Sequence, residues 1–431
     1  MNMKELAQRA KKASIALAAQ SGEKKNLALE YIAQMLDSRK ADIIEANSID
    51  LQNAQKNDLE KPLLKRLKFD EAKIKGVCDG IKSLISLEEP VGVTQKATEL
   101  DNGLELYRVT CPIGVIGIIF ESRPDALVQI STLCLKSGNS VLLKGGSEAA
   151  NTNRILADII AEAADKAGMP DGWIGLMETR DDVAAMLKLE DCIDLIVPRG
   201  SNEFVRYIMQ NTSIPVLGHA DGICHVYIDS EADIDMAVNI AVDSKCQYAA
   251  VCNAAETLLV HAAVAADFLP KFKERMDAND AVIKGCEKTR GIISAEPAAE
   301  IDWKTEYLDN IISVKIVDSL TEAIEHINTY GSGHTEAIVT KNRDTASQFM
   351  ALADSGNVFW NASTRFSDGF RYGLGAEVGI STNKIHARGP VGLEGLLIYK
   401  WKLIGSGQTV AEYAGGNKSF THKNLEKNCD I

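Results

Sequence analysis

Apolar and polar positions follow a helical spacing through the first 100 residues. Between Leu27 and Ile44, apolar side chains fall on one helical face and charged residues occupy the other positions. Residues 63–87 repeat this arrangement. A period near 3.6 residues is typical of an amphipathic α-helix with one buried face. We therefore expect the amino-terminal part of the chain to be helical.

From about residue 104 the pattern changes to short apolar runs that alternate with amphipathic segments. Two strands are predicted around the turn at Cys111 and Pro112. The next segments predict a helix at 124–135, a strand at 139–144, a helix at 148–167, and strands at 173–177, 194–198 and 216–218. Strands that alternate with helices of this length form a mostly parallel sheet covered on both faces.

A second run of the same kind starts near His225. It predicts a strand, a helix at 233–245, a polar loop around Cys252 and a further strand at 257–261, and it continues to about residue 357. Residues 361–395 are rich in glycine, serine, threonine and arginine, which is typical of a functional loop. Residues 396–405 predict one amphipathic strand that pairs outside the main sheets.

These elements predict an α/β protein with two parallel-sheet domains of the Rossmann-like type. We expect a cofactor-binding domain at 1–224 and a catalytic domain at 225–385. A return segment and oligomerisation strand would follow at 386–405, with the strand near 104–111 contributing to the same extension, and a polar, mobile tail at 406–431.

Charge and cysteine content restrict the class of function. The 431-residue chain has a formal charge of −13, which argues against non-specific nucleic-acid binding, since that requires a broadly basic surface. The longest apolar stretch, 109–120, contains glycines and a proline and is too short for a membrane helix. Nine scattered cysteines without a CxxC pair predict reduced thiols in a cytoplasm and no metal site.

Two strand-to-helix turns are candidates for binding a dinucleotide. Standard GxGxxG and GxxxxGK[ST] motifs are missing. Instead, Lys144 ends a predicted strand, Gly145 and Gly146 follow, and Ser147 is placed to cap a helix that opens at Glu148. A second turn follows Arg199, where Gly200 and Ser201 open a helix. Free N–H groups at a helix start suit phosphate, although each turn alone could equally be an ordinary connection.

Cys252 is the candidate nucleophile among the nine cysteines. It lies between a predicted helix and a strand, and its small neighbours leave the thiol accessible. Most cysteines are small buried apolar residues, and Cys78, Cys134, Cys192 and Cys246 fit that description. A reactive thiol needs nearby N–H groups or positive charge to become a thiolate. Cys252 differs from the other cysteines because it lies in a loop with small neighbours between a predicted helix and a predicted strand.

Basic and histidine-containing segments suggest an anion pocket. Arg123 ends a predicted strand, and His334 lies in a glycine-rich segment. A further glycine-rich loop gathers Arg365, Asp368 and Glu377. Arginines and histidines on loops are usually solvated, so it is their concentration between glycines that supports a binding site.

Together these segments resemble the aldehyde dehydrogenase superfamily and, within it, the γ-glutamyl phosphate reductase family. The resemblance spans about residues 5–405 and is most specific at 317–339, where the sequence reads VDSLTEAIEHINTYGSGHTEAIV. FESRP at 120–124, ETLLVH after the Cys252 loop, and NASTRFSDG at 361–369 also carry it.

The resemblance implies roles for the residues of these motifs. Cys252 matches the catalytic thiol. The turn with Lys144, Gly145, Ser147 and Glu148 matches the segment that holds the adenosine ribose and its phosphate. The turn with Gly200 and Ser201 would lie against the pyrophosphate, and Glu377 would contact the nicotinamide ribose. The implied cofactor is NADPH, but a carboxylate at Glu148 would also suit the 2′-hydroxyl of NAD.

Two positions depart from the hydrolytic members of the superfamily. Gly218 stands where those enzymes carry a glutamate that activates water. Ser122 and Arg123 stand where they carry an oxyanion-binding asparagine. Both departures fit a reductase that carries its substrate as a thioester, because an activated water would destroy that intermediate. The backbone N–H of Cys252 together with Asn253 would then hold the oxyanion.

The implied reaction is reduction of L-glutamate 5-phosphate to glutamate 5-semialdehyde with release of phosphate, the second step of proline biosynthesis. Arg123, His219, His334 and Arg365 would contact the anionic groups of the substrate, and Asp368 its ammonium. We expect the chain to form a homo-oligomer and to associate with a glutamate 5-kinase. Two alternatives stay open: an acylating aldehyde dehydrogenase that uses another donor such as a coenzyme A thioester, and an inactive family member with a structural role.

Overall fold

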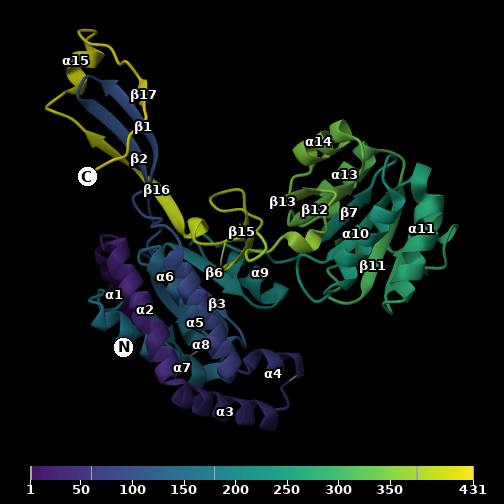
Figure 1. Ribbon diagram of the computed structural model, residues 1–431, viewed down its shortest axis with the longest axis horizontal. Helices are drawn as coiled ribbons and strands as arrows, with labels where there is room; N and C mark the ends of the chain where they lie inside the picture. Colours follow the sequence, from purple (N-terminus) through teal and green to yellow (C-terminus); the bar gives the residue numbers. More distant parts are fainter. Residues whose placement is uncertain (1, 60, 179, 375–376, 431) are drawn as a thin grey trace.

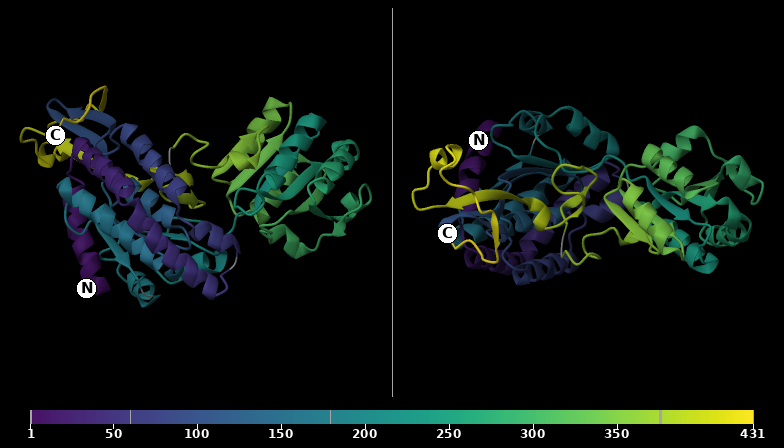
Figure 2. Two further views of the ribbon diagram at one scale, coloured as in Figure 1. Left: turned by 60° about the horizontal axis from the view of Figure 1, so that its bottom comes forward. Right: turned by 90° about the horizontal axis from the view of Figure 1, so that it is seen from above.

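The computed structural model describes residues 2–59, 61–178, 180–374 and 377–430. Two α/β domains and a separate strand extension make up an elongated molecule (Figures 1 and 2). Among the described residues, no helix is long and apolar enough to cross a membrane. Both domains contain a parallel sheet, as the alternation of strands and helices predicts.

The first domain is built on a four-stranded parallel sheet in the order β5-β4-β3-β6. Five helices precede it: α1 (Met3–Leu17), α2 (Gly22–Ser38), α3 (Lys40–Lys56), α4 (Lys61–Leu67) and α5 (Glu71–Ser86). The sheet and its connections are β3 (Val115–Phe120), α6 (Pro124–Lys136), β4 (Ser140–Lys144), α7 (Ala150–Lys166), β5 (Ile174–Met177), α8 (Arg180–Met186), β6 (Leu195–Arg199) and α9 (Asn202–Gln210). Every residue of β3 and β4 is buried, as expected for strands covered on both faces.

The second domain is built on a seven-stranded parallel sheet in the order β10-β9-β11-β8-β7-β12-β13. Its elements are β7 (Cys224–Ile228), α10 (Ile234–Cys246), β8 (Ala255–His261), α11 (Ala262–Asp277), β9 (Val282–Gly285), α12 (Glu287–Arg290), β10 (Glu296–Pro297), β11 (Ile311–Val317), α13 (Leu320–Tyr330), β12 (Thr335–Val339), α14 (Arg343–Leu352) and β13 (Asn357–Trp360). The chain then returns to the first domain, where Val378 and Val391 join the core.

An antiparallel sheet in the order β16-β2-β1-β17 projects from the first domain (Figure 1). It consists of β1 (Thr94–Asp101), β2 (Leu104–Pro112), β16 (Leu397–Ile404) and β17 (Lys423–Leu425). A two-stranded sheet of β14 (Gly379–Ser381) and β15 (Gly389–Val391) lies in the return segment. The prediction that residues 396–405 form a strand outside the main sheets is confirmed by its pairing with β2.

Three sequence expectations about elements are wrong. Residues 94–101 form β1, which the helical expectation missed because this exposed ribbon has almost no apolar alternation. The expected strand at 216–218 is reduced to a single bridge between Val216 and Ile196. The expected mobile tail contains α15 (Val410–Ala414) and β17, which pairs with β1. Tertiary pairing with a neighbouring strand orders these polar segments, and their own sequence pattern does not reveal it.

The amino-terminal end of α7 differs from the expected free anion site. Ser147 does not cap the helix; it begins a short 3₁₀ turn, and the main helix starts at Ala150. The buried carboxylate of Asp50 in α3 accepts hydrogen bonds from the backbone N–H groups of Asn151 and Thr152, at 3.2 and 2.8 Å. A carboxylate therefore already satisfies the first-turn donors of α7.

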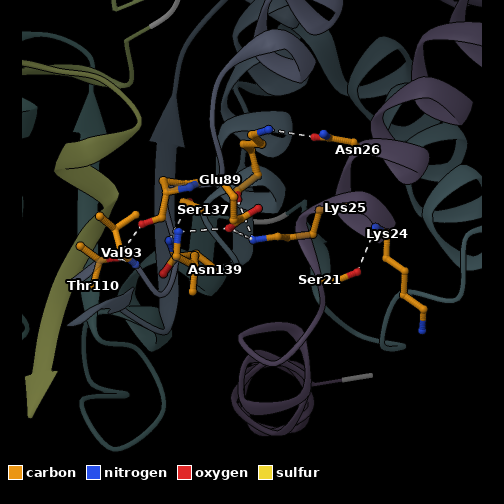
Figure 3. A network of polar contacts seen from close by, with 12 residues as sticks. Ser21, Lys24, Lys25, Asn26, Glu89, Val93, Thr110, Ser137 and Asn139 are labelled. Atoms are coloured by element: carbon orange, nitrogen blue, oxygen red, sulfur yellow. Dashed lines mark hydrogen bonds and ion pairs between the residues drawn. The ribbon is translucent and has the colours of Figure 1, made fainter. Parts of the chain in front are cut away.

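A buried lysine network fixes α2 against the rest of the first domain (Figure 3). The Lys25 side chain is 1% exposed, and its Nζ donates to Glu89 Oε1 at 2.5 Å and to the Lys136 carbonyl at 3.1 Å. The ammonium of Lys136 donates in turn to Asn26 Oδ1 and the Leu87 carbonyl, both at 2.8 Å. These bonds join α2, the end of α6 and the segment that leads into β1.

We expect Lys25→Ala to lower the free energy of unfolding by about 2–4 kcal/mol, since it leaves a carbonyl and a carboxylate without their buried donor. Urea denaturation of both proteins measures the change. Lys24→Ala is the matched control, because Lys24 is exposed and its ammonium contacts only Gln20; its effect should stay within about 0.5 kcal/mol. Equal effects of the two substitutions would contradict the role of the network.

Candidate active site

A cleft of about 660 Å³ lies between the two α/β domains and contains Cys252. Residues from both sheets line it: Phe120, Arg123, Arg199, Gly200, Ser201, His219, Cys252, Glu306 and Glu377. The first domain contributes the carboxyl ends of β3 and β6, and the second contributes the loop that precedes β8. Ligands of open parallel sheets bind outside the carboxyl ends of the strands, so this position suits a binding site.

A second cavity of about 560 Å³ adjoins the first, and the two share Leu63, Phe120 and Glu121. The turn after β4 lines it through Lys144, Gly145, Gly146, Ser147 and Glu148. The structure therefore places the two predicted turns along one continuous depression that ends at the cysteine. An elongated ligand such as a dinucleotide fits this arrangement better than a compact one.

The β4 turn is tightly packed against the rest of the first domain. A Cβ atom at Gly145 would lie 2.1 Å from Asn153 Nδ2, so no larger residue is accommodated without a shift. Glu148 Oε1 accepts hydrogen bonds from the Ser122 backbone N–H at 2.6 Å and from its hydroxyl at 2.7 Å. Ser122 has a positive φ of 43°, which costs backbone strain in a residue other than glycine. Strain held by a carboxylate is common at ligand sites.

The second turn opens α9 at the other cavity. Ser201 caps the helix, and its side chain accepts from the Phe204 N–H at 3.4 Å. This confirms the predicted strand-to-helix geometry at Gly200 and Ser201. Because both residues and Asn202 line the cleft, the start of α9 faces this cleft, and the N–H groups of a helix start suit an anionic group.

The Cys252 loop is held from several sides. Asn253 Nδ2 donates to the Ser367 carbonyl at 2.7 Å, and the Thr364 hydroxyl donates to the Asn253 carbonyl at 2.7 Å. A Cβ atom at Gly222 would lie 2.2 Å from the Cys252 carbonyl oxygen, so the chain can pass here only as glycine. The thiol itself is half-buried, in place of the open exposure that its small neighbours suggest.

The surroundings of Cys252 keep its thiol protonated in the free protein. Burial, followed by the negative charges of Glu306 and Glu377, raises the pKa of the thiol to about 12. The positive charge of Arg199 acts in the opposite direction. A nucleophilic cysteine in this cleft consequently needs a base or a bound ligand that changes the local charge.

Two neutral histidines lie beside the thiol. Burial lowers the pKa of His219, whose Nδ1 is 2.8 Å from the Ile380 carbonyl. Burial lowers the pKa of His334 still further, and its Nδ1 is 2.8 Å from Thr335 Oγ1. The rings meet edge to face with centroids 4.8 Å apart. Neither ring carries a positive charge at neutral pH, so contact with a substrate anion would be through N–H donation only.

The glycine-rich loop after β13 contributes a carboxylate to the cleft. Glu377 lines it and accepts from the Gly369 N–H at 2.8 Å. Asp368 accepts from the backbone N–H groups of Phe370 and Arg371 and so shapes the loop. Arg365 is buried against Gln247, with Nε donating at 2.9 Å, and it lies near enough to Cys252 for their charges to interact.

Sequence reasoning assigned no role to four charged residues of the cleft: Arg66, Glu121, Arg199 and Glu306. Arg199 precedes Gly200 at the end of β6, so its strand-end position was a usable signal. Glu121 directly follows β3 in the same way. Glu306 follows a 3₁₀ turn in a segment without any motif, and only the fold brings it to Cys252. Its carboxylate accepts from Asn202 Nδ2 at 2.6 Å, and burial raises its pKa.

The sequence model of the aldehyde dehydrogenase family matches this chain over residues 1–285 and 292–375. With a thiol between two parallel-sheet domains and two turns suited to a dinucleotide, the fold and the site agree with that match. The chain belongs to the aldehyde dehydrogenase family, which implies a nicotinamide cofactor.

Within that family, the chain belongs with the γ-glutamyl phosphate reductases. It is 66% identical to the γ-glutamyl phosphate reductase of Acetivibrio thermocellus over 427 residues, which cover 99% of each chain. It is 53% identical to the enzyme of that name from Methanococcoides burtonii, with 97% of this chain and 96% of the other covered.

Solved structures agree at the level of the fold. The γ-glutamyl phosphate reductase of Thermotoga maritima superimposes with a TM-score of 0.93 at 40% identity, covering 95% of this chain and 100% of that one. An acetylating aldehyde dehydrogenase from Geobacillus thermoglucosidasius has a TM-score of 0.64 at 18% identity, with 94% and 97% covered. The second likeness shows the shared fold alone.

We expect Glu306→Gln to lower the pKa of Cys252, because it removes a negative charge that disfavours the thiolate. Alkylation of Cys252 by iodoacetamide at mildly alkaline pH should then accelerate by about two- to tenfold, since one pKa unit changes the thiolate fraction tenfold. Peptide mass spectrometry follows the reaction at this residue. Glu300→Gln is the matched control in the same segment; it is exposed and bonded to Tyr330, and it should leave the rate unchanged. A slower reaction of Glu306→Gln would refute the electrostatic account.

Proposed function

We propose that this chain reduces γ-glutamyl phosphate to glutamate 5-semialdehyde and phosphate through a thioester on Cys252, as a step of proline biosynthesis. The observation that carries the proposal is a cysteine in the interdomain cleft together with glycine at the position of a hydrolytic base. Gly218 lines the same cleft, and a Cβ there would have ordinary contacts with Pro198 at 3.7 Å, so glycine is not required by packing. High identity to enzymes named γ-glutamyl phosphate reductase supports this substrate.

The nearby Glu306 does not replace the missing base. One oxygen of its carboxylate is held by Asn202, and the backbone of Gly222 also bonds to it. These contacts point to a structural and electrostatic role. A thioester on Cys252 is thereby protected from hydrolysis, which favours transfer to a reductant over release as a carboxylic acid.

His219 is the proposed base that converts the Cys252 thiol to a thiolate. Its Nδ1 donates to the Ile380 carbonyl, which fixes the tautomer and leaves Nε2 with a lone pair. A nitrogen of its ring lies within 4.8 Å of Cys252 Sγ, a separation that can close when the substrate binds. Burial lowers the pKa of His219, so the ring is not the charged anion contact expected from sequence. Because the same burial weakens it as a base, the proton transfer depends on the positive charge of Arg199 to stabilise the thiolate.

The thiolate then attacks the acyl carbon, the carbon–oxygen bond to phosphate breaks, and inorganic phosphate leaves. Arg123 and Arg199 line the cleft and would offset the charge of the leaving phosphate. The backbone N–H of Cys252, with Asn253, is the proposed oxyanion donor pair, and such donors contribute about 3–4 kcal/mol each to transition-state stabilisation. His334, Arg365 and Asp368 remain proposed substrate contacts.

NADPH is the proposed cofactor, and when bound it supplies the hydride that reduces the thioester carbonyl. Lys144 would meet the phosphate of the adenosine ribose from the end of β4. Glu148 directs one carboxylate oxygen to Ser122, which reduces its repulsion toward a phosphate. Gly145 and Ser147 would contact the same ribose, Gly200 and Ser201 the pyrophosphate, and Glu377 the nicotinamide ribose.

A homo-oligomer formed through the strand extension is also proposed. β16 lies at the edge of its sheet, and it exposes four large apolar side chains: Ile398, Tyr399, Trp401 and Leu403. Such an edge with apolar side chains is a pairing surface. Association with a glutamate 5-kinase stays a prediction from the resemblance.

We expect NADP reduction with glutamate semialdehyde to require inorganic phosphate, because reversal of the proposed reaction forms an acyl phosphate. Absorbance of the reduced nicotinamide measures the rate with phosphate, without it, and with coenzyme A in its place. Phosphate-independent or coenzyme A-dependent activity would reject the proposal. Cys252→Ala should lower turnover by roughly four orders of magnitude or more while nucleotide binding persists. Cys246→Ala, on the helix before the loop, should retain most activity.

Lys144→Met should weaken NADPH binding by about 10- to 150-fold and NADH binding much less, because a charged hydrogen bond to phosphate contributes about 1.5–3 kcal/mol. Fluorescence titration of the two nucleotides gives the ratio. Lys96→Met in the strand extension is the control and should change neither affinity. An equal loss of affinity for both nucleotides would show that Lys144 does not contact the phosphate of the adenosine ribose.

A further inference from the structure

Three potential metal ligands from distant segments converge at the inner end of the cleft. One ring nitrogen of His219, one of His334 and the sulfur of Cys252 all lie within 4.8 Å of one another. In a tetrahedral zinc site with bonds of about 2.0–2.3 Å, ligand atoms lie roughly 3.3–3.8 Å apart. A decrease of about 1 Å in the separations between these three atoms, which side-chain rotation can provide, would bring them to the distances of a zinc site.

Each histidine is already oriented as metal-bound histidines usually are. A coordinating imidazole commonly has its second nitrogen fixed by a hydrogen bond. His219 Nδ1 is 2.8 Å from the Ile380 carbonyl, and His334 Nδ1 is 2.8 Å from Thr335 Oγ1. In both rings Nε2 is left for a ligand.

His334 supplies an independent sign that something belongs in this space. The side chain is fully buried, and its Nε2 has no hydrogen-bond partner among the described residues. An unpaired buried polar atom costs about 1–3 kcal/mol, so it is rarely retained without a use. The Nδ1 atom of each ring is engaged by a neighbouring oxygen, so Nε2 is the nitrogen through which each ring would coordinate.

Access and charge also favour a cation. Cys252 and His219 line the cleft, whereas His334 lies behind them, so a metal ion would enter from the cleft and keep one coordination position open toward it. The carboxylates of Glu306 and Glu377 line the same space, and Arg199 opposes them. Two imidazoles and a thiolate form a ligand set that suits Zn²⁺ more than Mg²⁺ or Ca²⁺.

We propose that His219, Cys252 and His334 form an inhibitory Zn²⁺ site, in which the metal ion occupies the nucleophilic sulfur. On binding, the Cys252 S–H bond breaks, a Zn–S bond forms, and one proton is released to solvent. The neutral histidines donate lone pairs and release no proton. A sulfur bound to zinc cannot attack an acyl phosphate, so Zn²⁺ and the substrate compete for the same atom.

The test is zinc binding to the full, nucleotide-free chain, measured by calorimetry in buffers of different ionisation enthalpy. One Zn²⁺ and one released proton per chain are expected. Co²⁺ is the spectroscopic probe, and a near-ultraviolet sulfur-to-cobalt charge-transfer band is expected. Cys252→Ser should remove this band. His219→Asn and His334→Asn should each weaken Zn²⁺ binding by about a hundredfold or more, beyond the 10- to 100-fold typical of outer contacts.

Cys286→Ser is the matched control, because Cys286 is the thiol whose pKa is lowered by hydrogen bonds, and it lies outside the proposed site. It should leave zinc affinity and the cobalt band unchanged. Retention of the band in Cys252→Ser, its loss in Cys286→Ser, or no tight zinc site in the unmodified chain would overturn the proposal. His219→Asn provides the histidine test independently of the fully buried His334. Since binding is read without turnover, failure here would be distinguishable from failure of the proposed reaction.

Discussion

The cost of burying a thiol among carboxylates governs the organisation of this active site. Cys252 is half-buried, and Glu306 and Glu377 make its ionisation harder. The same desolvated setting keeps water away from a thioester and strengthens every charge that the cleft does contain. Arg199 and His219 therefore matter more than their number suggests, because they are the nearby groups that can stabilise or generate the thiolate.

The two domains contribute opposite ends of their sheets to the cleft. In the first domain, the carboxyl ends of β3, β4 and β6 deliver Glu121, Lys144 and Arg199. In the second, Cys252 and His334 directly precede β8 and β12, and these strands flank β7 in the sheet. In the proposed reaction, the first domain would bind the cofactor, and the second would hold the reactive side chains at the amino ends of adjacent strands.

Local sequence pattern was sufficient for much of this architecture. Buried parallel strands such as β3 and β4 read as continuous apolar runs, and the turn at Gly200 and Ser201 has a recognisable cap. The predictions that failed concern elements whose structure depends on residues far away in the sequence. The cap on α7 comes from Asp50, about a hundred positions earlier in the chain, and β17 is ordered only by β1.

In the site, too, some residues could be predicted from local sequence and others depend on distant contacts. Cys252 and the two turns could be found from motifs, whereas Glu306 and the approach of His219 to His334 could not. The absence of a CxxC pair argued against a metal site, but that argument covers only ligands that are close in sequence. Residues 219, 252 and 334 belong to three different connections. The order of strands brings Cys252 and His334 together, and the return segment holds the His219 ring through Ile380.

The two margins of the strand extension differ in length. β17 pairs with β1 over Ala97–Glu99 and is itself the second edge strand, with three residues against the eight of β16. A very short edge strand offers little backbone for pairing, so the homo-oligomer proposed above would join its copies through the β16 margin. The short β17 margin would accordingly favour a closed, two-fold assembly over an open-ended fibre.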